Sequence, residues 1–305
     1  MAKLRPITIN ETAKHLNQMR QLLEMLTNKD VYGDSGFSAD KDAILKIFAN
    51  TKDNKKEDVL IRLTLIDSMY STQMSRRYYA LEELAEALVE IARNNEIKSL
   101  FLAFSKNPEK NCNEFNYGKN KNLFSECYGI GKDGSDKGVA ISLISKYAYF
   151  LTGFRFPIYD SIACEMYPLV WHYCGFGDEC PKLIATENGR IQGELTMILF
   201  VNAINKLLVH LDCDGATYDL LDRFLWFVGK IRRGNLSLVL SRHEYEETMN
   251  LYPAKEVITL DKRGKEKKSI EYFNIERVDL NEFKFLKNNN VLRSFFELAQ
   301  FYGHK

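Results

Sequence analysis

Apolar residues recur every three or four positions along most of this chain, and this spacing constrains its fold more than any other feature. In the stretch 58–70, for example, Val59, Leu63, Ile66 and Tyr70 fall on one face of a helix. The same periodicity predicts further helices over 9–27, 41–49, 81–93, 137–151, 161–173, 192–210 and 217–230. The sequence therefore predicts a mainly α fold.

Strand-like composition is confined to the last third of the chain. Residues 236–240 read as a strand, and residues 256–260 with 269–275 read as a small hairpin around the basic turn DKRGKEKK. The polar stretch 107–122 is expected to be irregular. A change in composition near residue 235 divides the chain into a helical core, 1–235, and a C-terminal extension, 236–305, packed on that core.

Composition narrows the class of protein. The 305 residues are 45% apolar and 27% charged, and the net charge of +1 argues against binding nucleic acid through bulk charge. Local basic runs remain: 221–245 holds five basic and two acidic residues, and 255–268 holds six basic and three acidic residues. No apolar run reaches the roughly 18 residues of a membrane span. No secretory signal is visible, and we expect a cytoplasmic protein.

The cysteines and histidines do not form a metal-binding pattern. The six cysteines are scattered without a C-x-x-C motif, which favours reduced thiols over a metal cluster. His172 and His243 stand outside any motif. We therefore expect no metal and no cofactor.

The segment 128–167 carries the most chemical information. Gly129 and Gly131 mark a turn whose free N–H groups are expected to bond a phosphate oxygen. A helix follows, and a connection containing Pro157 then delivers Asp160 to the start of the next helix. Asp160 has two interpretations here: a helix N-cap, or a carboxylate that faces a cleft and stabilises positive charge.

This order of helix, glycine turn, helix, Pro-containing loop and Asp resembles the helix-hairpin-helix–Gly/Pro–Asp DNA glycosylases, and within them the 8-oxoguanine glycosylase-like branch. The resemblance covers about residues 55–230. The glycine turn lacks the family's proline, and the segment KDGSD separates it from the helix that follows. A second match is the Ser-Thr-Gln turn at 71–73, after an apolar helix, which is similar to the family's early helix ending in Gln or Asn.

The resemblance implies a helical fold of two lobes with a DNA-binding cleft between them. Such enzymes extrude a base from the duplex before they act on it. By this match Gln73 would enter the duplex beside the extruded nucleotide, and other residues would contact the DNA backbone or the base. The residues expected at the DNA backbone are Ser71, Thr72, Arg76, Gly129, Gly131 and Lys132, and those expected around the base are Tyr159, Trp226 and Asp222. Core packing is the alternative role for Trp226.

The chemistry that the family implies is cleavage of the N-glycosidic bond. Asp160 would stabilise the oxocarbenium-like sugar. A lysine amine would form a Schiff base at C1′, and Lys137 is the expected nucleophile because it follows the glycine turn. Lys132 and Lys146 are the other candidates; Lys146 projects from the opposite side of the helix and is expected to be a surface-edge residue. In the alternative without a lysine, Asp160 and water suffice.

The sequence thus predicts a monomeric DNA glycosylase whose partner is double-stranded DNA with a modified base. The resemblance extends to bacterial members that act on modified bases of phage DNA, including modified cytosines, and to housekeeping enzymes that remove oxidised purines. Two rival hypotheses remain: a catalytically inactive DNA-binding protein of the same fold, and a helical interaction protein with no nucleic-acid partner.

Overall fold

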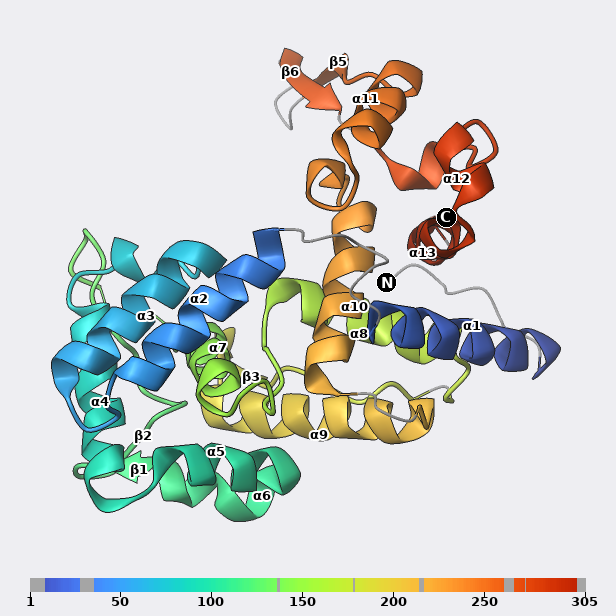
Figure 1. Ribbon diagram of the computed structural model, residues 1–305. Coiled ribbons are helices and arrows are strands. Elements are labelled where there is room, and N and C mark those ends of the chain that lie inside the picture. Colours follow the sequence, from blue (N-terminus) through green and yellow to red (C-terminus); the bar gives the residue numbers. More distant parts are fainter. Residues whose placement is uncertain are drawn as a thin grey trace.

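The computed structural model describes residues 9–27, 36–135, 138–177, 179–213, 217–260, 266–271 and 273–300. Within these ranges thirteen α-helices dominate, and the strands form three two-stranded antiparallel sheets (Figure 1). The prediction of a mainly α fold is confirmed. The helices are α1 (Ile9–Thr27), α2 (Gly36–Asn50), α3 (Lys56–Tyr70), α4 (Ala80–Asn94), α5 (Ile97–Lys106), α6 (Pro108–Asn111), α7 (Ile141–Leu151), α8 (Ser161–Tyr173), α9 (Gly193–Leu211), α10 (Tyr218–Arg232), α11 (Arg242–Leu251), α12 (Lys284–Asn288) and α13 (Asn290–Gln300).

The helices pack in two groups that meet at the centre of the molecule (Figure 1). Helices α2, α3 and α5 contact α7, and α4 packs against α3 and α5. On the other side, α1 contacts α8, α9, α10 and α13. The connection from α7 to α8 carries the chain from the first group to the second. Helix α1 thus lies among helices from the second half of the chain, an association that no local sequence pattern encodes.

The segment after residue 235 joins the same hydrophobic core as the rest of the chain. Phe295 of α13 contacts two rings of α10, at centroid distances of 4.6 Å from Phe227 and 5.6 Å from Phe224. The short sheet of β5 (Lys255–Leu260) and β6 (Glu266–Glu271) belongs to this segment. The change in composition near residue 235 therefore does not separate two cores.

Helix α9 is long and apolar enough to cross a membrane, the one such helix within the described ranges. Its apolar side chains include Met197, Phe200, Val201, Ile204 and Leu207, all of which are buried in the core. Its length and composition are therefore also those of a core helix in a helical protein.

Several helices begin and end where the periodicity predicts. Helices α1 and α8 match the predicted ranges 9–27 and 161–173, and α3, α4, α9 and α10 agree to within two residues at each end. Helix α7 begins at Ile141 rather than at 137, because Val139 is extended and forms a bridge with Cys127. The predicted hairpin is present, although its second strand is β6, three residues earlier than expected.

Other predictions from local composition were wrong. Residues 236–240 are not a strand: Leu236 to Leu238 form a 3₁₀ helix (η4), since Leu236 and Leu240 are buried at helical spacing while Leu238 is exposed. The stretch 107–122 is ordered as α6, the 3₁₀ helix η3 (Cys112–Phe115) and the strand pair β1 (Asn116–Tyr117) and β2 (Lys121–Asn122). Sequence reasoning also missed α5, α11, α12 and α13.

The glycine turn is built for close packing. Gly129 has φ of +75°, and a Cβ at this position would lie 2.6 Å from Cβ of Ala80 and 2.7 Å from the carbonyl oxygen of Tyr78. The neighbouring residue Ile130 forms a two-way backbone bridge with Tyr78. The absence of a side chain at 129 therefore lets this turn lie against the start of α4.

We expect Gly129→Ala to lower the free energy of unfolding by about 3 kcal/mol, because the new Cβ adds a steric clash to left-handed backbone strain. Gly134→Ala is the matched control: its φ is +74° and no atom lies within 4 Å of the added Cβ. The free energy of unfolding of that variant should fall by only about 1 kcal/mol. Urea denaturation measures both, and equal losses would refute the packing role.

Candidate active site

The pocket that gathers half of the predicted site residues lies between the two groups of helices. It has a volume of about 630 Å³, within the range of small-molecule sites. One wall comes from the end of α3 and from α7, and the other from the start of α8, from α10 and from η4. Its polar lining residues are Tyr70, Ser71, Thr72, Gln73, Ser142, Lys146, Asp160, Ser161, Asp222, Lys230 and Arg233, and its apolar ones are Met69, Ile158, Ile162, Trp226 and Leu238.

The connection between α7 and α8 determines where Asp160 lies. Phe156 is fully buried against Phe101 and Phe104, with ring centroids 5.4 Å and 6.1 Å away. Nearer to Asp160, the N–H of Tyr159 donates to Oγ of Ser145 on α7 at 2.9 Å. These contacts hold the chain before Asp160 against the first group of helices.

Asp160 combines the two interpretations that the sequence left open. Its Oδ1 accepts a hydrogen bond of 2.8 Å from the N–H of Ala163, so it is the N-cap of α8. The same side chain is only partly buried and lines the pocket. The cap leaves Oδ2 of the carboxylate without a role in the helix end, and it fixes the orientation of the whole group.

Lys146 is the candidate nucleophile that lines the pocket, where Lys230 is a second lysine. The prediction that it is a surface-edge residue was wrong: the residue is 3% exposed and lies on the pocket wall, where its Nζ donates to Oγ of Ser142 at 2.9 Å. Burial lowers the pKa of Lys146, and the carboxylates of Asp160 and Asp222 partly oppose this effect. A buried amine of this kind is closer to its neutral, nucleophilic form than a surface lysine.

The predicted nucleophile Lys137 lies outside the described residues. The helix that was predicted to begin at residue 137 begins at Ile141. Lys132 is exposed and does not line the pocket.

Asp222 on α10 faces the same pocket. Burial raises the pKa of Asp222 to about 7; Lys41 and Lys146 act against this shift, and the carboxylates of Asp160 and Asp219 add to it. A carboxyl group with this pKa exchanges its proton near neutral pH, as a general acid or base requires. Asp222, Trp226 and Lys230 follow one another at intervals of four residues, so one face of α10 lines the pocket.

The Ser-Thr-Gln turn borders the pocket at the end of α3. Ser71 and Gln73 are exposed residues in the left-handed conformation, with φ of 49° and 62°. Asp67 stabilises this turn by accepting hydrogen bonds from the Thr72 hydroxyl and from the N–H groups of Met74 (2.8 Å) and Ser75 (2.9 Å). The predicted turn is therefore present, and its three residues lie together at the pocket.

Arg76 extends the polar edge of that turn without entering the pocket. It is exposed, and its Nη1 donates to Oε1 of Gln73 at 3.4 Å. It is absent from the pocket lining.

The glycine turn does not present free N–H groups as expected. The N–H of Gly129 donates to Oε2 of Glu83 at 2.7 Å, and the N–H of Gly131 donates to the carbonyl of Ser135 at 2.9 Å. Neither glycine lines the pocket. The prediction that these two groups are free to bind a phosphate was wrong, since hydrogen bonds within the chain already use them.

Of the three residues predicted to surround a base, two line the pocket and one does not. Asp222 and Trp226 line the pocket, and Nζ of Lys230 lies 5.4 Å from the centroid of the Trp226 ring. Tyr159 does not line it: the ring is buried, 5.1 Å from Phe200 in an edge-on contact. Sequence reasoning missed Ser142, Lys230 and Arg233 as pocket residues, although the spacing from Asp222 to Lys230 along α10 was a readable signal for Lys230.

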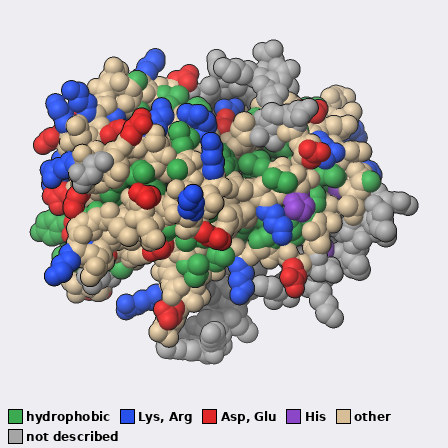
Figure 2. Space-filling model, turned by 90° about the horizontal axis from the view of Figure 1, so that it is seen from below, with side chains coloured by type: hydrophobic (Ala, Val, Ile, Leu, Met, Phe, Trp, Pro, Cys, Tyr) green, Lys and Arg blue, Asp and Glu red, His purple; other side chains and the backbone are tan. Residues whose placement is uncertain are grey.

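The basic run 221–245 is largely neutralised by carboxylates. Arg233 pairs with Glu165 at 2.7 Å, and Arg223 pairs with Asp219 at 2.8 Å. Arg242 pairs with Glu246 at 2.9 Å. On the face seen in Figure 2, acidic and basic side chains are interspersed. The positive charge around residues 221–245 is therefore smaller than the count of basic residues implies.

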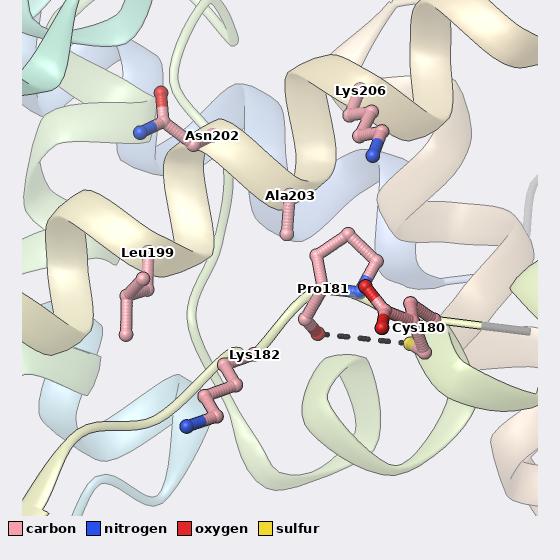
Figure 3. Close-up of a pocket in the computed structure, with 8 residues that line it drawn as sticks. Cys180, Pro181, Lys182, Leu199, Asn202, Ala203 and Lys206 are labelled. Carbon is pink, nitrogen blue, oxygen red and sulfur yellow. Dashed lines mark hydrogen bonds between the residues drawn. The ribbon is translucent and has the colours of Figure 1, made fainter.

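A second hollow of about 660 Å³ lies on the outer side of α9 (Figure 3). Lys182 comes from the chain before α9, whereas Asn202 and Lys206 come from α9 itself. Its one cysteine, Cys180, has a pKa raised by burial to about 11, which disfavours the reactive thiolate. The first pocket is the candidate active site, because burial shifts the pKa of three of its side chains, Lys146, Asp222 and Lys230, whereas the second hollow has Cys180.

Comparison with known proteins adds no assignment: no protein-family model, curated protein or solved structure matches the chain. Among the residues that the structure describes, no group of three or more His, Cys, Asp or Glu side chains is arranged to hold a metal ion. The functional argument therefore depends on the geometry of the pocket.

We expect Asp67→Asn to lower the free energy of unfolding by about 2 kcal/mol at pH 7, because the turn loses a charged acceptor. Burial alone would raise the pKa of Asp67, but the hydrogen bonds from Thr72, Ser75 and Met74 outweigh it and hold the pKa below its usual range. The stabilisation is thus present above about pH 4 and is lost as the pH falls through the lowered pKa. Urea denaturation at pH 7 and at pH 3 should show the difference between the two proteins narrowing; a constant difference would contradict this role.

Proposed function

We propose that this protein is a DNA glycosylase that excises a modified base from double-stranded DNA. One observation carries the proposal: a single pocket gathers Gln73, Lys146, Asp160, Asp222 and Trp226 from four separate parts of the chain. Each has a role that base excision requires. The succession of α7, a Pro-containing connection and an Asp at the start of α8 supports the resemblance to the helix-hairpin-helix–Gly/Pro–Asp glycosylases. The chain directly before the glycine turn holds β1, β2 and a turn instead of the expected helix. On this proposal the two groups of helices correspond to the lobes of that fold.

Asp160 is the residue that stabilises the transition state. As the N-glycosidic bond breaks, positive charge develops on C1′ and the ring oxygen of the sugar. A carboxylate fixed at this place lowers the barrier electrostatically without having to reorganise, since its cap to Ala163 already holds it. Asn at this position would keep the cap and remove the charge.

Lys146 is the nucleophile in the bifunctional form of the mechanism. Its neutral amine attacks C1′, the electron pair of the C1′–N bond leaves with the base, and the base takes up a proton. Loss of a proton from nitrogen and opening of the C1′–O4′ bond then give a protonated Schiff base, the precursor of strand cleavage. In the hydrolytic form, water replaces Lys146 as the nucleophile, and Asp160 keeps its role.

Trp226 and Asp222 hold the extruded base. An aromatic wall offers a stacking surface, and a carboxyl group that titrates near pH 7 is able to donate or accept a hydrogen bond at the edge of the base. Gln73 stands at the pocket edge on an exposed, left-handed turn, where its side chain is able to fill the space that the base leaves. With about 630 Å³, the pocket has room for a nucleobase that carries an additional group, which supports modified bases, including modified cytosines of phage DNA, as substrates.

We expect borohydride to trap a covalent complex between the protein and duplexes that carry its modified base, and Lys146→Met to abolish the trapping. The test uses duplexes with 8-oxoguanine, 5-hydroxymethylcytosine and other modified bases. Lys110→Met, which changes an exposed lysine of α6 outside the pocket, is the control and should trap as the unaltered protein does. Abasic sites without trapping would assign the hydrolytic form, and trapping that persists in Lys146→Met would refute the role of Lys146.

We expect Asp160→Asn to reduce base release by about 100-fold or more while duplex binding is retained, since Asn caps a helix as well as Asp. Asp212→Asn changes a carboxylate whose side chain is 90% exposed and should leave base release unchanged. Alkali-labile sites measure release, and binding is followed at several salt concentrations. Binding without abasic product for any base would favour the inactive DNA-binding protein; absence of binding at low salt would overturn the proposal.

A further inference from the structure

A row of polar side chains runs from the pocket into the protein between α7 and α10. Lys146 and Tyr149 lie three residues apart on α7, and Asp219 and Asp222 lie three residues apart on α10. The hydroxyl of Tyr149 donates to Oδ1 of Asp219, while Lys146 and Asp222 both line the pocket. We call these four residues together with Lys41 the polar seam.

Lys41 brings a positive charge from α2 to the inner end of the polar seam. The residue is 3% exposed, and its Nζ donates to Oη of Tyr149 at 2.5 Å and to Oδ1 of Asp219 at 2.7 Å. The rings of Tyr149 and Phe154 lie 5.0 Å and 5.3 Å from the same nitrogen. An ammonium group buried to this extent is retained only where it is paired, and Asp219 supplies the pairing charge.

Asp219 has a second cationic partner, Arg223. Nη2 of Arg223 lies 2.8 Å from Oδ2 of Asp219, so one carboxylate faces two cations. Burial alone would raise the pKa of Asp219, but Lys41, Tyr149 and Arg223 outweigh it and keep the group ionised. Among the charges around Asp222, Lys41 exerts the strongest attraction.

We propose that Lys41 is a positioning residue that sets the charge state of Asp222, and through it that of Lys146, in the pocket. The titratable groups that act on Asp222 come from four helices: Lys41 on α2, Lys146 and Tyr149 on α7, Asp160 at the start of α8 and Asp219 on α10. Lys41 itself is not among the residues that line the pocket. The inference deepens the proposed function and rests on it only for the identity of the reaction.

The consequence is a proton transfer inside the pocket. Because Lys41 opposes the rise in the pKa of Asp222, a share of Asp222 is ionised at neutral pH, and this carboxylate is able to take a proton from the ammonium group of Lys146. The N–H bond breaks with its electron pair left on nitrogen, an O–H bond forms, and the products are a neutral amine and a carboxylic acid. Without the charge of Lys41, Asp222 is already protonated at neutral pH and no longer accepts the proton.

The test is a titration of Asp222 in the full chain without DNA. The protein is labelled with ¹³Cγ-aspartate, and the resonance of Asp222 is assigned by its absence from Asp222→Asn. We expect its titration midpoint near pH 7 to move up by about 1 pH unit in Lys41→Gln, whose amide keeps a polar contact but carries no charge. In Lys41→Arg, which keeps the charge, the midpoint of Asp222 should equal that of the unaltered protein.

Two further variants exclude a merely structural effect. Lys56→Gln removes the charge of a lysine that pairs with Glu86 on the surface, and the midpoint of Asp222 should not move. If Lys41→Gln does not fold, Lys41→Met takes its place, because an apolar chain needs no partner at this buried position. An unchanged midpoint in the folded neutral variant, or an equal shift in Lys41→Arg, would overturn the proposal.

The titration separates this inference from the proposed function. A shifted midpoint together with no base release from any duplex would leave the role of Lys41 standing and refute the glycosylase. Base release together with an unmoved midpoint would support the glycosylase and refute the role of Lys41.

Discussion

The connection between α7 and α8 is the constraint on which the candidate site depends. Phe156 is held in the aromatic cluster of the first group of helices, and the N–H of Tyr159 is bonded to Ser145 on α7. Asp160 then begins α8, which belongs to the second group. The carboxylate therefore stands at the seam between the two groups, and the pocket exists because α10 and the end of α3 face it from either side.

The candidate site also depends on a balance of buried positive and negative charges. Lys41 and Lys146 are almost completely buried, and three carboxylates, Asp160, Asp219 and Asp222, lie close enough to influence them. A buried charge without a partner costs several kcal/mol, so each member of this set depends on the others. The arrangement yields an amine with a lowered pKa beside a carboxyl group with a raised one. Such opposite shifts within one pocket are more typical of reaction sites than of structural ion pairs.

The structure gives local roles to two residues for which the sequence predicted functional ones, Asp160 and Gly129, and the local and functional roles are compatible in only one case. For Asp160 the two are compatible, because one carboxylate oxygen caps α8 while the side chain still lines the pocket. For Gly129 they are not, because its N–H is already bonded to Glu83 and its missing side chain serves contact with α4. A carboxylate has two oxygens to share between roles, whereas a backbone N–H donates to one acceptor at a time.

The sequence by itself determined the mainly α class, the bounds of helices such as α1 and α8, the turn at Gln73 and the N-cap at Asp160. These are set by periodicity and capping within a few neighbouring residues. Only the tertiary structure decided that Lys146 is buried, that Asp222 meets it and that Lys41 reaches α10 from α2. Helical periodicity shows which residues share a face of one helix, but not which other helix that face meets. The partners of a buried charge lie up to 178 residues away along the chain, and their proximity is a property of packing alone.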